Sequence, residues 1–115
     1  MPSTLSPVVS SALKRFRASL ARRFGERLRE VTLYGSYARG SAHDESDVDV
    51  FVVVDDLDDN EADEVSRMAY FIDAEAGHEW AGLSPLAYDT RHATEMRARE
   101  KLLMRDIARD GVPVA

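Results

Sequence analysis

The stretch that decides the fold runs from Val31 to Val54 and reads VTLYGSYARGSAHDESDVDVFVVV. Its first four residues are β-favouring and end at Gly35, which is typical of a strand that enters a tight turn. Its last six residues, Asp49 to Val54, form a nearly continuous apolar run, which is typical of a central strand covered on both faces. We therefore predict two strands joined by a polar loop.

The first part of this loop is suited to bind a phosphate. Gly35 has no Cβ, so a phosphate can approach the backbone amides where a short helix would begin. The hydroxyl of Ser36 is a further donor, and Arg39, one helical turn on, carries a forked cation that suits an outer phosphate oxygen. Gly40 would then end the turn. These four residues are our candidates for nucleotide binding.

Two aspartates follow at a spacing that suits a metal site. Asp47 and Asp49 are two positions apart, so in a strand their carboxylates leave the same face, about 6 to 7 Å apart. Such a pair can hold Mg²⁺. Two magnesium ions about 3.5–4 Å apart would activate an attacking hydroxyl and neutralise the charge on a departing pyrophosphate.

The rest of the chain predicts helices and strands on both sides of this stretch. Apolar spacings of three and four indicate amphipathic helices, Asn60 is a candidate cap, and Pro85 places a later strand at a sheet edge. We expect the first and last helices to flank a cleft above Gly35 and Asp49. The expected elements are helices over 7–25, 61–77 and 90–111, and strands over 31–34, 49–54 and 83–88.

Length and composition limit the classes of protein to which this chain can belong. The 115 residues have room for one domain, which we take to span 1–115, and 44% hydrophobic with 31% charged residues are ordinary globular values. The net charge of -6 argues against free nucleic-acid binding, because an acidic surface repels a phosphate backbone. The chain has no cysteine, no signal-peptide core and no apolar run long enough to span a membrane. We therefore expect a cytoplasmic protein without membrane contacts.

The pattern of Gly35-Ser36, ten residues, then Asp47-x-Asp49 resembles the DNA polymerase β-like nucleotidyltransferase superfamily. The chain looks like the smallest branch of that superfamily, the minimal nucleotidyltransferases. The resemblance implies an α/β (α+β) fold, with a small mixed sheet packed with helices. It also implies that Gly35 and Ser36 bind the nucleotide triphosphate, that Arg39 contacts its outer phosphates, and that Asp47 and Asp49 ligate Mg²⁺.

The sequence departs from this pattern at a third carboxylate. Active members of the superfamily usually place another acid on a neighbouring strand, where it completes the metal site and can act as a base. Here the matching position holds Ser84. Asp89, at the end of that strand, and Glu79, before it, are the candidates to replace the acid, although both are more simply solvated loop residues.

The resemblance also implies a biological role. Minimal nucleotidyltransferases are often encoded beside a HEPN-domain ribonuclease, and the two act as a toxin–antitoxin pair. In this interpretation the chain is the antitoxin and transfers AMP from ATP, with Mg²⁺, to a tyrosine of the toxin within a hetero-oligomer. The alternative is a non-catalytic module that masks its toxin and keeps a degenerate nucleotide site. Transfer to a small molecule is a third hypothesis, but it lacks the additional domain that usually builds such a pocket.

A basic helix face stands out in this acidic chain. The first predicted helix and the residues after it carry a cluster of cations, which is either a solvated surface or a docking or phosphate-facing surface. The cluster consists of Lys14, Arg15, Arg17, Arg22, Arg23, Arg27 and Arg29.

Overall fold

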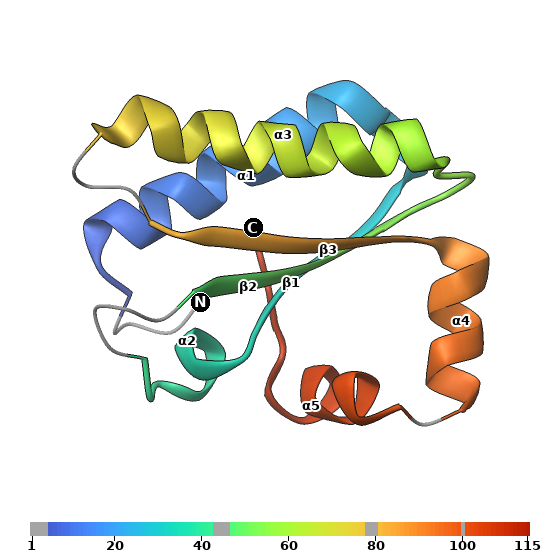
Figure 1. Cartoon of the computed structure of the whole chain (residues 1–115). Helices are drawn as coiled ribbons and strands as arrows, with labels where there is room; N and C mark the ends of the chain where they lie inside the picture. The colour runs from blue at the N-terminus through green and yellow to red at the C-terminus, as the bar shows by residue number, and fades with distance from the viewer. Residues whose placement is uncertain (1–4, 43–46, 78–80, 100) are drawn as a thin grey trace.

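Four strands form one mixed sheet in the order β3-β2-β1-β4, with helices on both of its faces (Figure 1). The computed structural model describes residues 5–42, 47–77, 81–99 and 101–115. None of the helices in these ranges is long and apolar enough to cross a membrane. In chain order, the elements are α1 (Pro7–Phe24), the 3-10 turn η1 (Gly25–Arg27), β1 (Leu28–Tyr34), α2 (Ser36–Arg39), β2 (Val48–Val54), α3 (Asp59–Ala76), β3 (Leu83–Asp89), α4 (Thr90–Ala98), α5 (Leu102–Asp110) and β4 (Val112–Pro113).

The central strands are β1 and β2. β1 runs antiparallel to both β2 and β4, whereas β2 runs parallel to β3. A parallel connection requires a crossover, and α3 supplies it between β2 and β3. β3 lies at the edge of the sheet, as Pro85 predicts. This mixed α+β architecture confirms the expected fold class.

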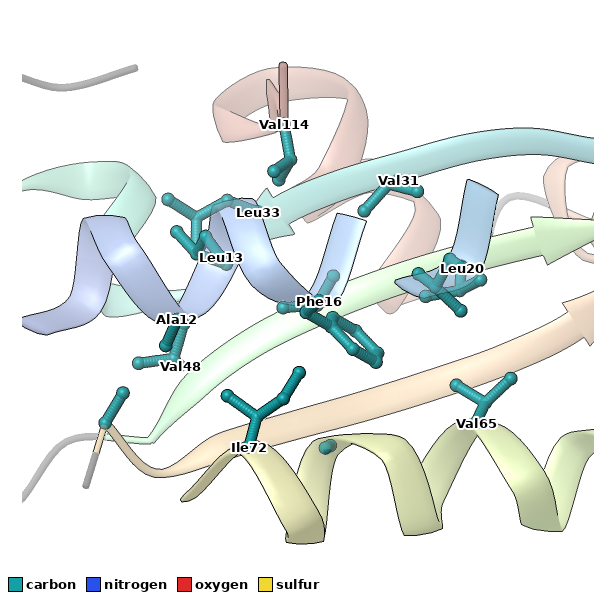
Figure 2. Close-up of a cluster of buried hydrophobic side chains, with 14 of the residues drawn as sticks. Ala12, Leu13, Phe16, Leu20, Val31, Leu33, Val48, Val65, Ile72 and Val114 are labelled. Atoms are coloured by element: carbon teal, nitrogen blue, oxygen red, sulfur yellow. The ribbon is translucent and has the colours of Figure 1, made fainter. Parts of the chain in front are cut away.

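The larger core lies between the sheet and the helices α1 and α3. Alternate residues of β2 point toward these helices, because successive side chains of a strand leave opposite faces. Figure 2 shows Leu13, Phe16 and Leu20 of α1 meeting Val65 and Ile72 of α3 over the strands. The β2 residues of this core are Val48, Val50, Val52 and Val54.

A smaller core covers the opposite face. Phe51 and Val53 of β2 pack there against Ala93 of α4 and against Met104 and Ile107 of α5. The alternation along β2 places Asp49 on this same face, on the side of α4 and α5. The expectation that α1 and the last helix flank a cleft above Asp49 is therefore wrong, because α1 packs on the other face (Figure 1).

Two boundaries also differ from the predicted ones. The predicted C-terminal helix is two helices, since α4 ends at Ala98 and α5 begins at Leu102. The cap of α3 is Asp58 rather than Asn60: its side chain accepts a hydrogen bond from the amide of Glu61, whose carboxylate accepts one from the amide of Asp58. This reciprocal capping box satisfies two amides that the helix itself leaves without partners.

Several residues of the basic cluster form ion pairs with α3. Arg15 pairs with Glu75 of α3, and Arg23 pairs with Glu64 of α3 at 2.7 Å. Arg27 of η1 donates to both carboxylate oxygens of Glu61, each at 2.8 Å. These pairs join the N-terminal helix to α3, so this part of the cluster stabilises the packing of two helices.

Candidate active site

The turn after β1 is built as the loop sequence predicts. Gly35 has a φ of 76° and precedes the short helix α2, in which the amide of Arg39 donates to the Gly35 carbonyl at 3.1 Å. Gly40 takes a left-handed conformation and ends the helix. Both glycines have positive φ, a region that side chains with a Cβ rarely adopt. The turn thus presents Ser36 and Arg39 at the end of β1.

Gly35 allows Asp49 to lie directly against this turn. A Cβ built on Gly35 would lie 2.3 Å from Oδ2 of Asp49 and 3.2 Å from its Cγ. No carbon atom can approach an oxygen that closely without displacement. The absence of a side chain at position 35 is therefore what lets the carboxylate of β2 reach the Gly35 turn.

The charges around Asp49 shift its pKa in opposite directions. Asp49 is half-buried, and its pKa is raised first by burial and second by the negative charge of Asp47, which lies just before β2. The guanidinium of Arg39 acts in the opposite direction and lowers the pKa of Asp49. The structure thus brings Gly35, Arg39, Asp47 and Asp49 together at one end of the β1–β2 pair.

Two further residues lie beside Asp49 in the sheet. Asp49 is in register with Tyr34 of β1 and with Ser84 of β3, so the three residues form one row across the same face. Burial, the charge of Asp49 and Tyr88 together raise the pKa of Tyr34 to about 12. Tyr34 was missed from the sequence, because its pairing with Asp49 depends on the register of the two strands. Its position immediately before Gly35 is the only signal in the sequence.

Asp89 lies apart from this row. It is in register with Val54, five residues along β2 from Asp49, which corresponds to about 16 Å. Its carboxylate accepts a hydrogen bond from the amide of Arg91 at 3.0 Å and caps α4. The structure therefore gives Asp89 a capping role and does not bring it to the aspartate pair. Glu79, the other candidate, lies outside the described residues.

The donors at the site fit a hard divalent cation. Two carboxylates of like charge, one of them half-buried with a raised pKa, are relieved when a cation lies between them. Mg²⁺ is commonly held by one or two carboxylates together with substrate phosphates and water. In the parts of the chain that the structure describes, no cluster of three or more metal-ligating side chains occurs. The two carboxylates at this site therefore fit a magnesium ion.

Comparison with known protein families shows the family to which this sequence is similar. Residues 13–107, most of the chain, match the family described as the nucleotidyltransferase domain. The chain belongs to this family. The matched residues include β1, the Gly35 turn, Asp47 and Asp49, and β3.

Two curated relatives of this nucleotidyltransferase domain come from Methanocaldococcus jannaschii. MJ0604 is 41% identical over 44 residues and MJ0141 is 40% identical over 45 residues, and the names of both give protein adenylyltransferase as their activity. The matches cover 38% and 39% of this chain. The chain spans less than half of each relative, 44% and 46% of their lengths.

Two of the solved structures with a similar fold are described as toxin–antitoxin structures. One was determined with AMP-PNP and has a TM-score of 0.56 at 22% identity, covering 87% of this nucleotidyltransferase domain and 70% of that chain. Another is a point mutant of the toxin–antitoxin MntA-HpeT, with a TM-score of 0.55 at 22% identity, covering 89% and 71%. At 22% identity, this similarity shows a shared fold alone.

Proposed function

We propose that this domain transfers AMP from ATP to a hydroxyl of a partner protein and acts as the antitoxin of a toxin–antitoxin pair. The acceptor is a tyrosine, and the partner is a HEPN-domain ribonuclease toxin. The observation that carries the proposal is the carboxylate of Asp49, which lies against the Gly35 turn and within the influence of Asp47 and Arg39. Further support comes from relatives named as protein adenylyltransferases and from neighbours in fold that are toxin–antitoxin complexes.

The proposed chemistry assigns a task to each residue. The Gly35–Ser36 turn and Arg39 bind and orient the triphosphate, with the Arg39 guanidinium on its outer oxygens. The tyrosine oxygen forms a bond to the α-phosphorus, the bond to the bridging oxygen breaks, pyrophosphate leaves, and the phenolic proton passes to a carboxylate or water. Mg²⁺ held by Asp47 and Asp49 would neutralise charge that builds on the phosphates. The expectation of two such ions remains a prediction.

A protein acceptor suits the exposed surface along the edge strand β3. A pocket of about 600 Å³ lies between α3 and β3 and is lined by Tyr70, Asp73, Ser84 and Pro85 among others. We call it the α3–β3 pocket. Tyr70 and its neighbour Phe71 are 70% and 59% exposed, which is unusual for two consecutive aromatic residues. Ser84 lines this pocket and is in register with Asp49, whose carboxylate lies on the opposite face of the sheet from α3, so a docked acceptor would bring its hydroxyl around the edge strand β3 to reach the carboxylates.

A second function is favoured by Ser84 itself. Its hydroxyl stands in register with Asp49, where active members of the superfamily place a carboxylate. A site with two carboxylates binds a metal less firmly than one with three, and it lacks the third acid as a base. The second candidate is therefore a non-catalytic antitoxin that masks its toxin.

The test is AMP transfer followed by intact mass. The protein is incubated with ATP, Mg²⁺ and the ribonuclease encoded beside it, and the wild type is compared with the double variant Asp47→Asn, Asp49→Asn. The matched control is Asp59→Asn, Asp63→Asn, which removes the same charge from exposed positions on α3. We expect the partner to gain the mass of AMP with the wild type and the control but not with the double variant.

The two candidate functions give opposite results in this experiment. If the partner gains no mass and binds the wild type and the double variant equally well, the masking function is correct and the transferase function is wrong. Binding is measured separately by size-exclusion chromatography with light scattering, so a failure to associate is distinguished from a failure to react.

A further inference from the structure

We propose that the α3–β3 pocket binds an arginine side chain of the partner protein. Its volume of about 600 Å³ falls within the usual range of ligand pockets, roughly 300–1,000 Å³. The role of an arginine here rests on the proposed function, because the same pocket is the surface proposed to receive the acceptor protein. Three features of its lining, taken in turn below, select this side chain.

The outer edge of β3 offers carbonyl oxygens to the pocket. The amide of Val48 donates to the Gly82 carbonyl at 2.9 Å, and Val48 is in register with Leu83. In a parallel pair this pattern turns the backbone groups of Leu83 and Pro85 away from β2. The amide of Leu83 donates to Asp73 at 2.9 Å, and Pro85 has no amide hydrogen. Since none of the strands that the structure describes pairs with this edge, the two carbonyls face outward as acceptors.

Asp73 gives the pocket a negative charge. Its Oδ1 accepts a hydrogen bond from the amide of Ala81 at 3.2 Å, and its Oδ2 accepts the one from Leu83. A carboxylate can accept about four hydrogen bonds, so these two leave room for further donors. Among the described residues that line the pocket, Asp73 alone is charged, and the salt bridges within the described part of the chain do not include it.

Tyr70 adds an exposed aromatic ring beside this carboxylate. The residue is 70% exposed, and its ring meets that of Phe71 edge-on, with the ring centroids 5.9 Å apart. Tyr70 and Asp73 are three residues apart on α3, so their side chains are neighbours on the helix surface. A cation over a tyrosine ring is attracted by the negative face of the ring. A positive group in the pocket can therefore contact the ring and the carboxylate together.

A guanidinium group suits this lining better than an ammonium group. It is planar, stacks on aromatic rings, and carries five N–H donors that can reach carbonyl and carboxylate oxygens at once. An arginine also fits the proposed ribonuclease, because a protein that binds RNA carries a basic surface. The net charge of -6 on this chain favours the approach of such a surface. We therefore specify the occupant as an arginine on the basic surface of the partner.

The test uses a short peptide and the complete protein, without ATP or toxin. The probe is Gly-Leu-Arg-Leu-Gly, and the matched peptides carry lysine or uncharged citrulline in place of arginine. A two-dimensional NMR titration measures the affinity and locates the peptide through the backbone amides of Tyr70, Ala74 and Leu83. The variants are Tyr70→Leu and Asp73→Asn, and the control for charge is Asp63→Asn, an exposed position of α3 outside the pocket.

We expect the arginine peptide to bind most tightly and to shift the amides that border the pocket. Affinity should fall about threefold in Tyr70→Leu and about fivefold in Asp73→Asn, and should not change in Asp63→Asn. Tyr70→Leu decides the test if Asp73→Asn does not fold, because Tyr70 is exposed.

Equal binding of the citrulline peptide would overturn the proposal, because the pocket would then not recognise a positive charge. An equal loss in Asp63→Asn, or shifts confined to amides outside α3 and β3, would also overturn it, because the attraction would come from elsewhere. The result is separate from that of the transfer experiment. AMP transfer without arginine binding would refute the role of the pocket alone, and arginine binding without AMP transfer would refute the transferase function alone.

Discussion

At Gly35, one methyl group decides whether Asp49 can reach the turn. Gly35→Ala would place a Cβ 2.3 Å from Oδ2 of Asp49 and would hold alanine at a φ of 76°. The backbone strain costs about 1–3 kcal/mol, and the carboxylate must move away from the Gly35 turn. We expect a lower melting temperature together with a loss of Mn²⁺ binding, measured by calorimetry with Mn²⁺ in place of Mg²⁺.

Gly25→Ala is the control for this substitution. Gly25 also has a positive φ, 56°, but no atom lies within 4 Å of the Cβ built there. It should lose a similar amount of stability and keep its metal affinity. Equal loss of Mn²⁺ binding in both variants would mean that general destabilisation, and not displacement of Asp49, removes the site.

The pKa of Tyr34 reports on the charge of Asp49. Burial is the larger cause of its elevation to about 12, and Asp49 is the second. Asp49→Asn should therefore lower this pKa only part of the way toward 10. An absorbance titration of tyrosinate measures it, and Tyr34→Phe should remove the component near 12. A titration curve unchanged by Tyr34→Phe would show that Tyr34 is not the elevated group.

The spacing of residues in the sequence could predict only part of the candidate site. The sequence separation places Gly35, Arg39, Asp47 and Asp49 within one loop and one strand, and the structure brings them together. The register of β1 and β3 against β2 arises only from long-range pairing. For this reason the row through Tyr34 could not be predicted, and the distance of Asp89 from the site became clear only in the structure.

At the scale of elements, the N-terminus of α3 should make the protein sensitive to acid. Hydrogen bonds from Arg27 and from the backbone of Asp58 lower the pKa of Glu61 to about 2. A carboxyl group whose pKa is lowered by folding stabilises the folded state at pH values above its ordinary pKa, near 4.5. This stabilisation is lost as the pH falls through about 2. Glu61→Gln should therefore lower the melting temperature at pH 7, and the difference from wild type should vanish near pH 2.

Circular dichroism melts over this pH range measure the effect. Glu95→Gln, a change of an exposed residue on α4, is the control and should melt like the wild type throughout. A difference for Glu61→Gln that stayed constant down to pH 2 would show that the ion pair with Arg27 does not set the acid sensitivity.

Helices and strands with a strong hydrophobic periodicity were predicted well. Boundaries that tertiary packing determines were predicted less well. The apolar spacing of α1, the valine run of β2 and the edge position of β3 all agree with the structure. The break between α4 and α5 has no glycine or proline signal. A single helix over 90–110 would be about 31 Å long, too long for both Ala93 and Ile107 to pack against Phe51 and Val53.

At the scale of the whole molecule, the exposed aromatic pair on α3 should control transfer to a protein. Tyr70→Ser, Phe71→Ser removes the apolar surface beside the α3–β3 pocket without changing the carboxylates. We expect a several-fold increase in the KM for the partner protein, with ATP affinity unchanged. The rate of AMP transfer at varied partner concentration measures the first, and calorimetry measures the second.

Leu102→Ser is the matched control, because Leu102 of α5 is 76% exposed and lies outside the pocket. It should leave the KM for the partner unchanged. The acceptor docks elsewhere if both variants behave like the wild type. A change in the oligomeric state of the aromatic variant, measured by light scattering, would instead show that a second copy covers this face.

The mixed sheet also determines the order in which the molecule can assemble. Tyr34, Gly35 and Asp49 belong to one antiparallel pair whose strands are joined by a single loop, so their contacts close a short length of chain. Ser84 pairs with Asp49 only after the whole of α3 has crossed the sheet. Because contacts between distant residues form more slowly, the nucleotide side of the proposed site should take shape on the folding pathway before its acceptor side.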